Sequence, residues 1–177
     1  MSEENALVLV VDDNEMNRDM LSRRLKRMNY DVIVAEDGEQ ALAMVTEHPF
    51  NLVLLDIMMP TISGYEVLER MKQDDTTKHI PIIMISAVDD LDSVVRCIEL
   101  GAEDYLFKPF NPVLLKARIG ASLRKNRMTV ANLVPIIQTI QSSLDALTAS
   151  DVLGEQHSNL SLIQEQLNNL TAILNND

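Results

Sequence analysis

Short apolar runs alternate with segments of helical periodicity through the first 127 residues of the chain. The runs with the length and apolar content of strands are Leu7–Val11, Asp31–Ala35, Leu52–Asp56, Ile82–Ser86 and Asp104–Phe107. Apolar residues spaced three and four apart predict helices at about 15–28, around 41–45, at 64–72, through 91–98 and at 112–127. The pattern therefore predicts five β-α units in succession.

The strand pattern also predicts a parallel sheet. The first, third and fourth runs are apolar at almost every position, which is typical of strands covered by helices on both faces. In open sheets of this kind, sites form at the carboxyl ends of the strands. The polar residues at those ends are Asp12, Asp13, Asp56, Ser86 and Lys108. We therefore expect carboxylates, a hydroxyl and an ammonium group at one edge of the sheet.

This combination of side chains favours phosphoryl chemistry around a divalent cation. Close carboxylates repel one another unless protons or a cation separate their charges. Mg²⁺ prefers oxygen ligands such as carboxylates, waters and phosphate oxygens. Lys108 and Ser86 are suited to binding phosphate oxygens. Asp56, in the middle of the set, can act as a nucleophile and form an aspartyl-phosphate, while the metal and the lysine stabilise the charge.

Five short motifs follow one another in a fixed order. They are VVDDN at 10–14, LLDIMMP at 54–60, Gly64, IIMISA at 82–87 and GAEDYLFKPF at 101–110. Together they resemble the receiver domain of two-component response regulators, over about residues 5–127. The resemblance implies an α/β, flavodoxin-like fold: a doubly wound five-stranded parallel sheet in the order 2-1-3-4-5. We therefore expect a receiver domain at 1–127.

The same resemblance implies an acceptor and a metal site. Asp56 matches the phosphoryl acceptor of the family. Asp12 and Asp13 match its acidic metal pocket, which Asp56 and the backbone carbonyl of Met58 complete as Mg²⁺ ligands. An alternative remains open, because acidic residues before the helix at Glu15 are also typical helix caps.

The resemblance further implies a phosphate-binding lysine and a switch. Lys108 matches the lysine, and Lys108–Pro109 matches a cis peptide bond of the family. Ser86 and Tyr105 match the switch pair, in which the hydroxyl moves towards the phosphoryl group and the ring turns inward. As alternatives, Ser86 satisfies a strand end and Tyr105 is a half-buried strand aromatic. The apolar side chain of Met58 does not position an attacking water, so we expect slow self-dephosphorylation.

Residues 128–177 have a different pattern. Apolar residues step by three and four in two series: Leu133, Ile137, Ile140, Leu144 and Leu147, then Leu160, Ile163, Leu167, Leu170 and Leu174. They predict two helices, at about 134–149 and 157–175, with Pro135 in the first turn of the earlier one. Two apolar positions in seven are typical of a coiled-coil seam.

Such a tail buries little by itself, so we expect a helical hairpin that forms a homodimer through 133–174 as a four-helix bundle. Two alternatives are a hairpin folded onto its own receiver and a surface for another partner. The tail faintly resembles the dimerisation hairpin of sensor histidine kinases. Its first predicted helix has no histidine, which makes it at most a structural copy.

Charge excludes some functions. The net charge is −12, and residues 128–177 contain five acidic residues without a lysine or arginine. Sequence-independent nucleic-acid binding requires clustered basic residues, so we expect no direct DNA binding. Neither a signal peptide nor an apolar run of membrane-spanning length is visible, which favours a cytoplasmic protein.

These features predict a signalling protein that catalyses only its own phosphorylation and dephosphorylation. It would accept a phosphoryl group from a sensor histidine kinase or phosphotransfer protein and then signal by binding a protein partner. Two alternatives are a phosphorelay shuttle and the receiver fragment of a longer output enzyme. A Mg²⁺-dependent phosphatase shares the chemistry but needs a second acid where Met58 stands.

Overall fold

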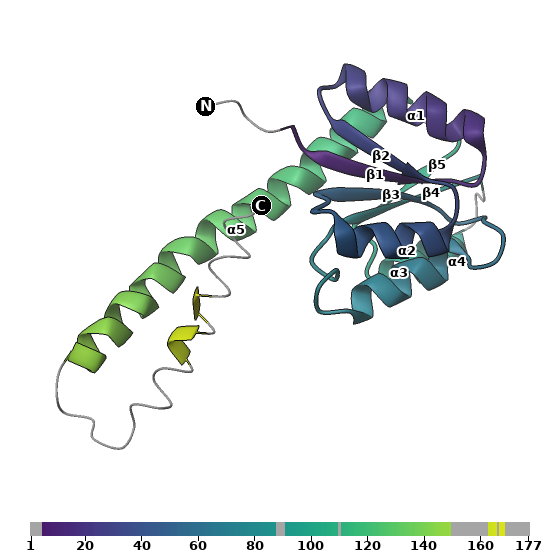
Figure 1. Ribbon diagram of the computed structural model, residues 1–177. Helices are drawn as coiled ribbons and strands as arrows, with labels where there is room; N and C mark the ends of the chain where they lie inside the picture. The colour runs from purple at the N-terminus through teal and green to yellow at the C-terminus, as the bar shows by residue number, and fades with distance from the viewer. Residues whose placement is uncertain (1–4, 88–90, 110, 150–162, 166, 169–177) are drawn as a thin grey trace. The chain divides into compact units, whose positions relative to one another are not determined.

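The computed structural model of the chain describes residues 5–87, 91–109, 111–149, 163–165 and 167–168. Its strands form one parallel sheet in the order β2-β1-β3-β4-β5 (Figure 1). The strands are β1 (Leu7–Val11), β2 (Asp31–Ala35), β3 (Leu52–Asp56), β4 (Ile82–Ser86) and β5 (Asp104–Phe107). The sheet order and the strand bounds confirm the predicted flavodoxin-like fold.

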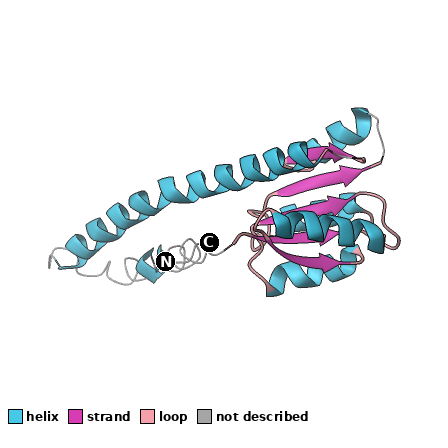
Figure 2. Ribbon diagram, turned by 90° about the horizontal axis from the view of Figure 1, so that it is seen from above, coloured by secondary structure: helices cyan, strands magenta, loops and turns pink. Residues whose placement is uncertain are grey.

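Helices cover both faces of this sheet (Figure 1, Figure 2). The helices are α1 (Glu15–Arg27), α2 (Gly38–Glu47), α3 (Gly64–Gln73), α4 (Leu91–Glu99) and α5 (Pro112–Ala149). On one face, Leu55 belongs to a core that includes Leu68 of α3. On the other face, Leu54 shares a core with Leu21 of α1 and Leu115 of α5. Two aliphatic cores therefore enclose the sheet, as the strand pattern predicted.

Strand β3 is the central strand of the sheet. It pairs with β1 on one side and with β4 on the other. All of its residues are buried, including Asp56 at its carboxyl end. Successive side chains of a strand point to opposite faces, and both faces here are covered by helices. The apolar run Leu52–Leu55 therefore holds Asp56 at the end of a fully buried, central strand of the sheet.

The start of α1 decides one open alternative. Asn14 is the N-cap of this helix, and its side chain accepts a hydrogen bond from the Asn17 amide at 3.2 Å. The Asp12 carboxylate accepts from the Asn14 amide at 2.9 Å, one residue before the helix begins. The interpretation of Asp12 and Asp13 as caps of α1 is therefore wrong, because Asn14 caps the helix.

The prediction of two helices, one ending at residue 127 and the next beginning at 134, is wrong, because α5 is a single helix from Pro112 to Ala149 with Pro135 in its interior. The predicted domain boundary after residue 127 stays a prediction. Residues 128–134 contain neither glycine nor proline, so nothing in them stops the helix. Proline inside a helix destabilises it by about 3 kcal/mol, because the residue has no backbone N–H to donate and its ring clashes with the preceding turn. The backbone oxygen of Pro135 accepts a hydrogen bond from the Thr139 hydroxyl at 2.9 Å. The expectation that Pro135 begins a new helix therefore fails.

The chain divides into two compact units, Met1–Arg124 and Lys125–Asp177. The second unit has a small core of its own. Ile137 and Leu144 of α5 are buried in a cluster with Leu167. These two α5 residues are seven positions apart, as the predicted seam requires.

The segment that meets α5 in this unit is partly described. The side-chain amide of Gln141 donates to the Asn168 side-chain oxygen at 3.0 Å. Residues 163–165 and 167–168 are helical. The rest of the predicted helix at 157–175 lies outside the described residues, so the helical hairpin stays a prediction.

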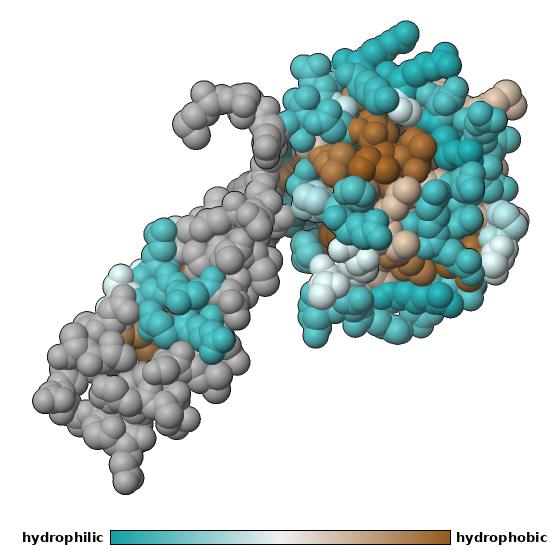
Figure 3. Space-filling view, in the orientation of Figure 1, coloured by the Kyte–Doolittle hydropathy of each residue, from teal (hydrophilic) through white to brown (hydrophobic). Residues whose placement is uncertain are grey.

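In Figure 3, apolar surface on the first unit gathers where the edge strand β2 lies between α1 and α2. Val34 of this strand is 39% exposed. Among the described residues, no helix combines the length and the apolar character that crossing a membrane requires.

Candidate functional site

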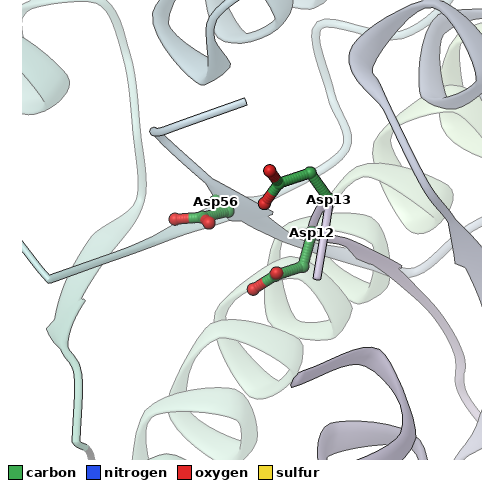
Figure 4. A group of neighbouring side chains, drawn as sticks. All are labelled: Asp12, Asp13 and Asp56. Atoms are coloured by element: carbon green, nitrogen blue, oxygen red, sulfur yellow. The ribbon is translucent and has the colours of Figure 1, made fainter. Parts of the chain in front are cut away.

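Acidic side chains meet where β1 and β3 end. Asp12 and Asp13 directly follow β1, and Asp56 is the last residue of β3. The two strands are paired, so their carboxyl ends lie side by side. Oxygen atoms of the three carboxylates lie within 4.8 Å of one another. Figure 4 shows the carboxylates extending to the same side of the strand ends, with Asp12 and Asp56 buried and Asp13 exposed.

Lys108 joins this cluster from the segment after β5. Its Nζ donates to Asp12 Oδ2 at 2.7 Å and to Asp56 Oδ2 at 2.9 Å. The lysine side chain is 19% exposed, and those of Asp12 and Asp56 are 2% and 7% exposed. Contacts of this length between shielded opposite charges are strong hydrogen bonds. The structure thus brings together the predicted acceptor, two predicted metal ligands and the predicted phosphate-binding lysine.

Burial and the lysine act on the Asp56 carboxyl in opposite directions. Burial raises the pKa of Asp56, the hydrogen bond and charge of Lys108 lower it, and the nearby Asp12 raises it again; the net direction is upward. Burial also lowers the pKa of Lys108, but its hydrogen bonds to Asp12 and Asp56 more than compensate and raise it overall. Lys108 is therefore an ammonium ion at neutral pH.

Two residues of α1 support the acidic pair, and sequence reasoning did not name either. Asn17 donates from Nδ2 to Asp12 Oδ1 at 3.1 Å. Arg18 donates from Nη1 to the backbone oxygens of Asp12 and Asp13, at 2.8 and 2.9 Å. In a single sequence, both look like ordinary polar residues in the first turns of a helix. Only the way that α1 folds back towards the end of β1 reveals their contacts.

The predicted switch residues lie on β4 and β5. Ser86 ends β4 and is completely buried. Asp56 pairs with Ile85, so Ser86 stands one residue further along the neighbouring strand. Tyr105 is 6% exposed, and its ring centroid lies 4.9 Å from that of Phe107. Tyr105 is thus buried rather than half-buried, whereas its role in a switch stays a prediction.

The loop after β3 passes close to Asp56, the predicted acceptor. The backbone amide of Met58 hydrogen-bonds to the Asp56 carboxylate and lowers its pKa, while the Met58 side chain is 64% exposed. The predicted role of the Met58 carbonyl as a metal ligand stays a prediction. Gly64 begins α3 against this loop and donates its amide to Ile57 O at 2.9 Å. A Cβ at Gly64 would lie 2.1 Å from the backbone oxygen of Asp56.

The geometry agrees with comparisons to known proteins. A model of the response regulator receiver domain matches residues 8–120, which is more than half of the chain. The chain belongs to the response regulator receiver family. A putative response regulator of known structure from Chloroflexus aurantiacus is 34% identical, with a TM-score of 0.66, and the match covers 68% of this chain and 98% of that one. The family is one of signalling proteins rather than of enzymes.

Receiver domains bind Mg²⁺ at a cluster of aspartates, and the residues present here fit that ion. Carboxylate oxygens are the ligands Mg²⁺ prefers, and an octahedral ion with bonds of about 2.1 Å places opposite ligands about 4.2 Å apart. The oxygens of Asp12, Asp13 and Asp56 lie within 4.8 Å of one another, close to this span. These three carboxylates would therefore be the residues that hold the ion.

Curated relatives of this receiver protein are longer than the matched segment. A probable transcriptional regulator, ycf27, from Porphyridium aerugineum is 45% identical over 119 residues, which cover 67% of this chain and 48% of the relative. The phosphate regulon transcriptional regulatory protein PhoB from Pseudomonas aeruginosa is 41% identical over 118 residues, covering 67% and 52%. The chain thus spans about half the length of these relatives. Because they are named as transcriptional regulators, the comparisons do not support the expectation of no DNA binding.

Proposed function

We propose that this receiver protein is a phosphorylation-activated response regulator in a two-component pathway. It accepts a phosphoryl group on Asp56 from a sensor histidine kinase and then signals through a protein–protein interaction. The position of Lys108 Nζ carries this proposal, because it bonds both Asp12 and Asp56 beside the third carboxylate, Asp13. A nucleophile, a fixed cation and metal ligands thus meet at one edge of the sheet.

Each residue has a separate task in the proposed transfer. An Asp56 oxygen forms a bond to phosphorus as the bond from phosphorus to the donor's histidine nitrogen breaks, and that nitrogen keeps the electron pair. Lys108 neutralises charge on the phosphoryl oxygens, because its ammonium already lies 2.9 Å from the acceptor. Asp12 and Asp13 hold Mg²⁺, which supplies further charge stabilisation when bound. Burial of Asp56 keeps water away from the reacting carboxylate.

The proposed output begins at Ser86 and Tyr105 and ends on the surface formed by α4, β5 and the start of α5. This surface has exposed apolar side chains: Leu91, Val95, Ile98, Phe107, Val113 and Leu114. Cys97 is the only buried residue of α4. A helix anchored by so little buried surface shifts at small energetic cost. Phosphorylation at Asp56 would therefore change the partner that this surface binds.

Nuclear magnetic resonance spectroscopy of the isotope-labelled protein, which follows the chemical shifts of its backbone amides, tests this switch. Addition of Mg²⁺ and then of beryllofluoride, a mimic of the phosphoryl group, is expected to shift the amide signals of Ser86 and Tyr105 and of α4. Mg²⁺ alone should shift only residues near Asp12 and Asp13. If beryllofluoride perturbs Asp56 and Lys108 but leaves Tyr105 and α4 unchanged, the proposed output surface is wrong.

A phosphorelay shuttle uses the same acceptor as a switch, so the lifetime of the phosphoryl group on the phosphorylated protein is the measurement that separates the two. A shuttle returns its phosphoryl group rapidly to a histidine-phosphotransfer protein. A switch retains the group, and the exposed, apolar Met58 beside Asp56 gives no help to an attacking water. We therefore propose a long-lived phosphoryl group and a switch. Since the chain spans about half of its relatives, a receiver fragment of a larger protein remains the other proposal.

For the tail, we propose a homodimer through 133–174. Ile137 and Leu144 are buried within the unit, but their neighbours in the seam are exposed: Leu133 by 41%, Ile140 by 43% and Ile163 by 44%. Leu133 and Ile140 are seven residues apart, so they form a second apolar row along α5. A second copy presents the same row, and pairing the two rows would give a four-helix bundle. Few charged residues in the tail oppose this pairing.

Replacement of Ile140 by Asp is expected to weaken the dimer by about 30-fold, because a carboxylate would replace a central apolar contact. Gln138→Asp is the matched control, since it adds the same charge at an exposed position of the same helix. Light scattering over a concentration series measures both. A wild-type chain that is monomeric throughout, or an equal effect of both substitutions, would contradict the proposed dimer.

A further inference from the structure

Arg18 makes two hydrogen bonds beside the acidic cluster. A single nitrogen, Nη1, donates to the backbone oxygens of Asp12 and Asp13 at 2.8 and 2.9 Å. The residue lies in the first turns of α1, and its side chain is half-buried. Its bonds therefore connect α1 to the backbone that carries two of the three carboxylates.

The two acidic residues depend on this connection to different degrees. The Asp12 carboxylate is held independently by Lys108, by the Asn14 amide and by Asn17. The Asp13 carboxylate is exposed, and within the described part of the chain no hydrogen bond reaches it. The position of the Asp13 side chain relative to the other two carboxylates therefore depends on its backbone, and Arg18 holds that backbone.

We propose that Arg18 is a positioning residue for Mg²⁺. By fixing the Asp12–Asp13 peptide, it keeps the Asp13 carboxylate facing those of Asp12 and Asp56, and so raises the affinity of the cluster for the ion. This inference rests on the metal site of the proposed function and extends it to a residue that does not touch the metal. Groups that orient metal ligands commonly change metal affinity by about 10- to 100-fold.

Positioning and charge predict opposite results here. Arg18 carries a positive charge close to a cation site, and like charges repel. If charge were its only influence, removing the guanidinium would tighten Mg²⁺ binding. If Arg18 positions Asp13, removing it would weaken binding, because the carboxylate loses its fixed direction. The sign of the change therefore decides between the two.

The test is calorimetric titration of the full chain with Mg²⁺ alone, at constant ionic strength. Arg18→Ala is expected to bind Mg²⁺ about 10-fold more weakly than the wild type. Arg18→Lys should recover most of the affinity, because one ammonium group can donate to both backbone oxygens, as the single Nη1 atom of Arg18 does. Arg23→Ala is the matched control: this guanidinium lies on the same helix but is exposed and pairs only with Asp19 among the described residues. Its removal should change the affinity by less than about 2-fold.

Equal or tighter binding by Arg18→Ala would overturn the inference, as would equal weakening by Arg23→Ala. Thermal unfolding without Mg²⁺ shows whether each variant is folded. If Arg18→Ala does not fold, Arg18→Gln replaces it: Mg²⁺ binding weaker than that of Arg18→Lys supports positioning, and equal binding overturns it. If the wild type itself binds no Mg²⁺, the metal site of the proposed function is wrong as well. Failure of the inference alone is thus distinguishable from failure of the function.

Discussion

Asn in place of Asp56 is expected to abolish phosphoryl uptake, lowering its rate by at least about 1,000-fold. An amide has no carboxylate oxygen with which to attack phosphorus, yet it has nearly the same shape and still accepts the hydrogen bond from Lys108. The measurement is incorporation of labelled phosphate from acetyl phosphate in the presence of Mg²⁺. The wild type should gain the label, and Asp56→Asn should not.

Asp75→Asn is the matched control for this substitution. Its carboxylate is 88% exposed and pairs with Lys78 on the surface, far along the chain from the strand ends. The same chemical change there should leave uptake unchanged. Uptake by Asp56→Asn at the wild-type rate would place the acceptor on another residue.

The Asp56→Asn variant should be more stable than the wild type at neutral pH. Burial raises the pKa of Asp56 in the folded state, so folding favours the protonated carboxyl. The stability that this group contributes is therefore complete below the pKa of the unfolded chain, and it is lost as the pH rises through the folded value. Asn carries no charge at any pH. The stability difference between Asp56→Asn and wild type should accordingly shrink as the pH falls, which thermal unfolding at several pH values measures.

Substitution of Gly64 by Ala is expected to destabilise the receiver unit by about 3 kcal/mol. The added Cβ would lie 2.1 Å from the backbone oxygen of Asp56 and 2.8 Å from the Cα of Ile57. Both neighbours are backbone atoms, so relief requires the chain next to the acceptor to move. Urea unfolding followed by circular dichroism measures the loss, and phosphoryl uptake should fall with it because Asp56 is displaced.

Gly120 provides the control within the same unit. A Cβ there would meet only Nη1 of Arg124, at 3.2 Å, and this flexible side chain can move aside. Gly120 lies inside α5, where alanine is favoured over glycine by about 1 kcal/mol. Gly120→Ala should therefore stabilise the protein slightly. If the two substitutions have equal effects, the close approach of α3 to Asp56 does not constrain the fold.

The receiver fold was predictable because its strands are short and buried on both faces. The run from Leu52 to Leu55 leaves no choice of face, so the pattern predicts the strand and its bounds together. The meeting of Asp56 and Lys108 was predictable for a related reason, since each stands at the carboxyl end of a predicted strand of one parallel sheet. Ser86 follows the same rule on the neighbouring strand.

Other features carry no such pattern. Asn17 and Arg18 look like solvent-facing helix residues, and their roles follow from how α1 meets β1 rather than from their spacing. The continuity of α5 was mispredicted because the preference of Pro135 for a first helical turn is weaker than the combined helical preference of its neighbours. The roles of Asn17 and Arg18 thus depend on contacts between elements, whereas the error at α5 came from giving one residue's preference too much weight.

The central position of β3 has a consequence for amide hydrogen exchange. Its backbone is paired on both sides and its side chains are enclosed in two cores, so its amides should exchange only when the whole receiver unfolds. Helix α4, which has a single fully buried residue, belongs to the opposite, fast-exchanging end of the range. The proposed acceptor is therefore carried by one of the slowest-exchanging parts of the described structure, and the proposed output surface by one of the fastest. Helix α4 can therefore open and close many times without unfolding the strand that carries Asp56.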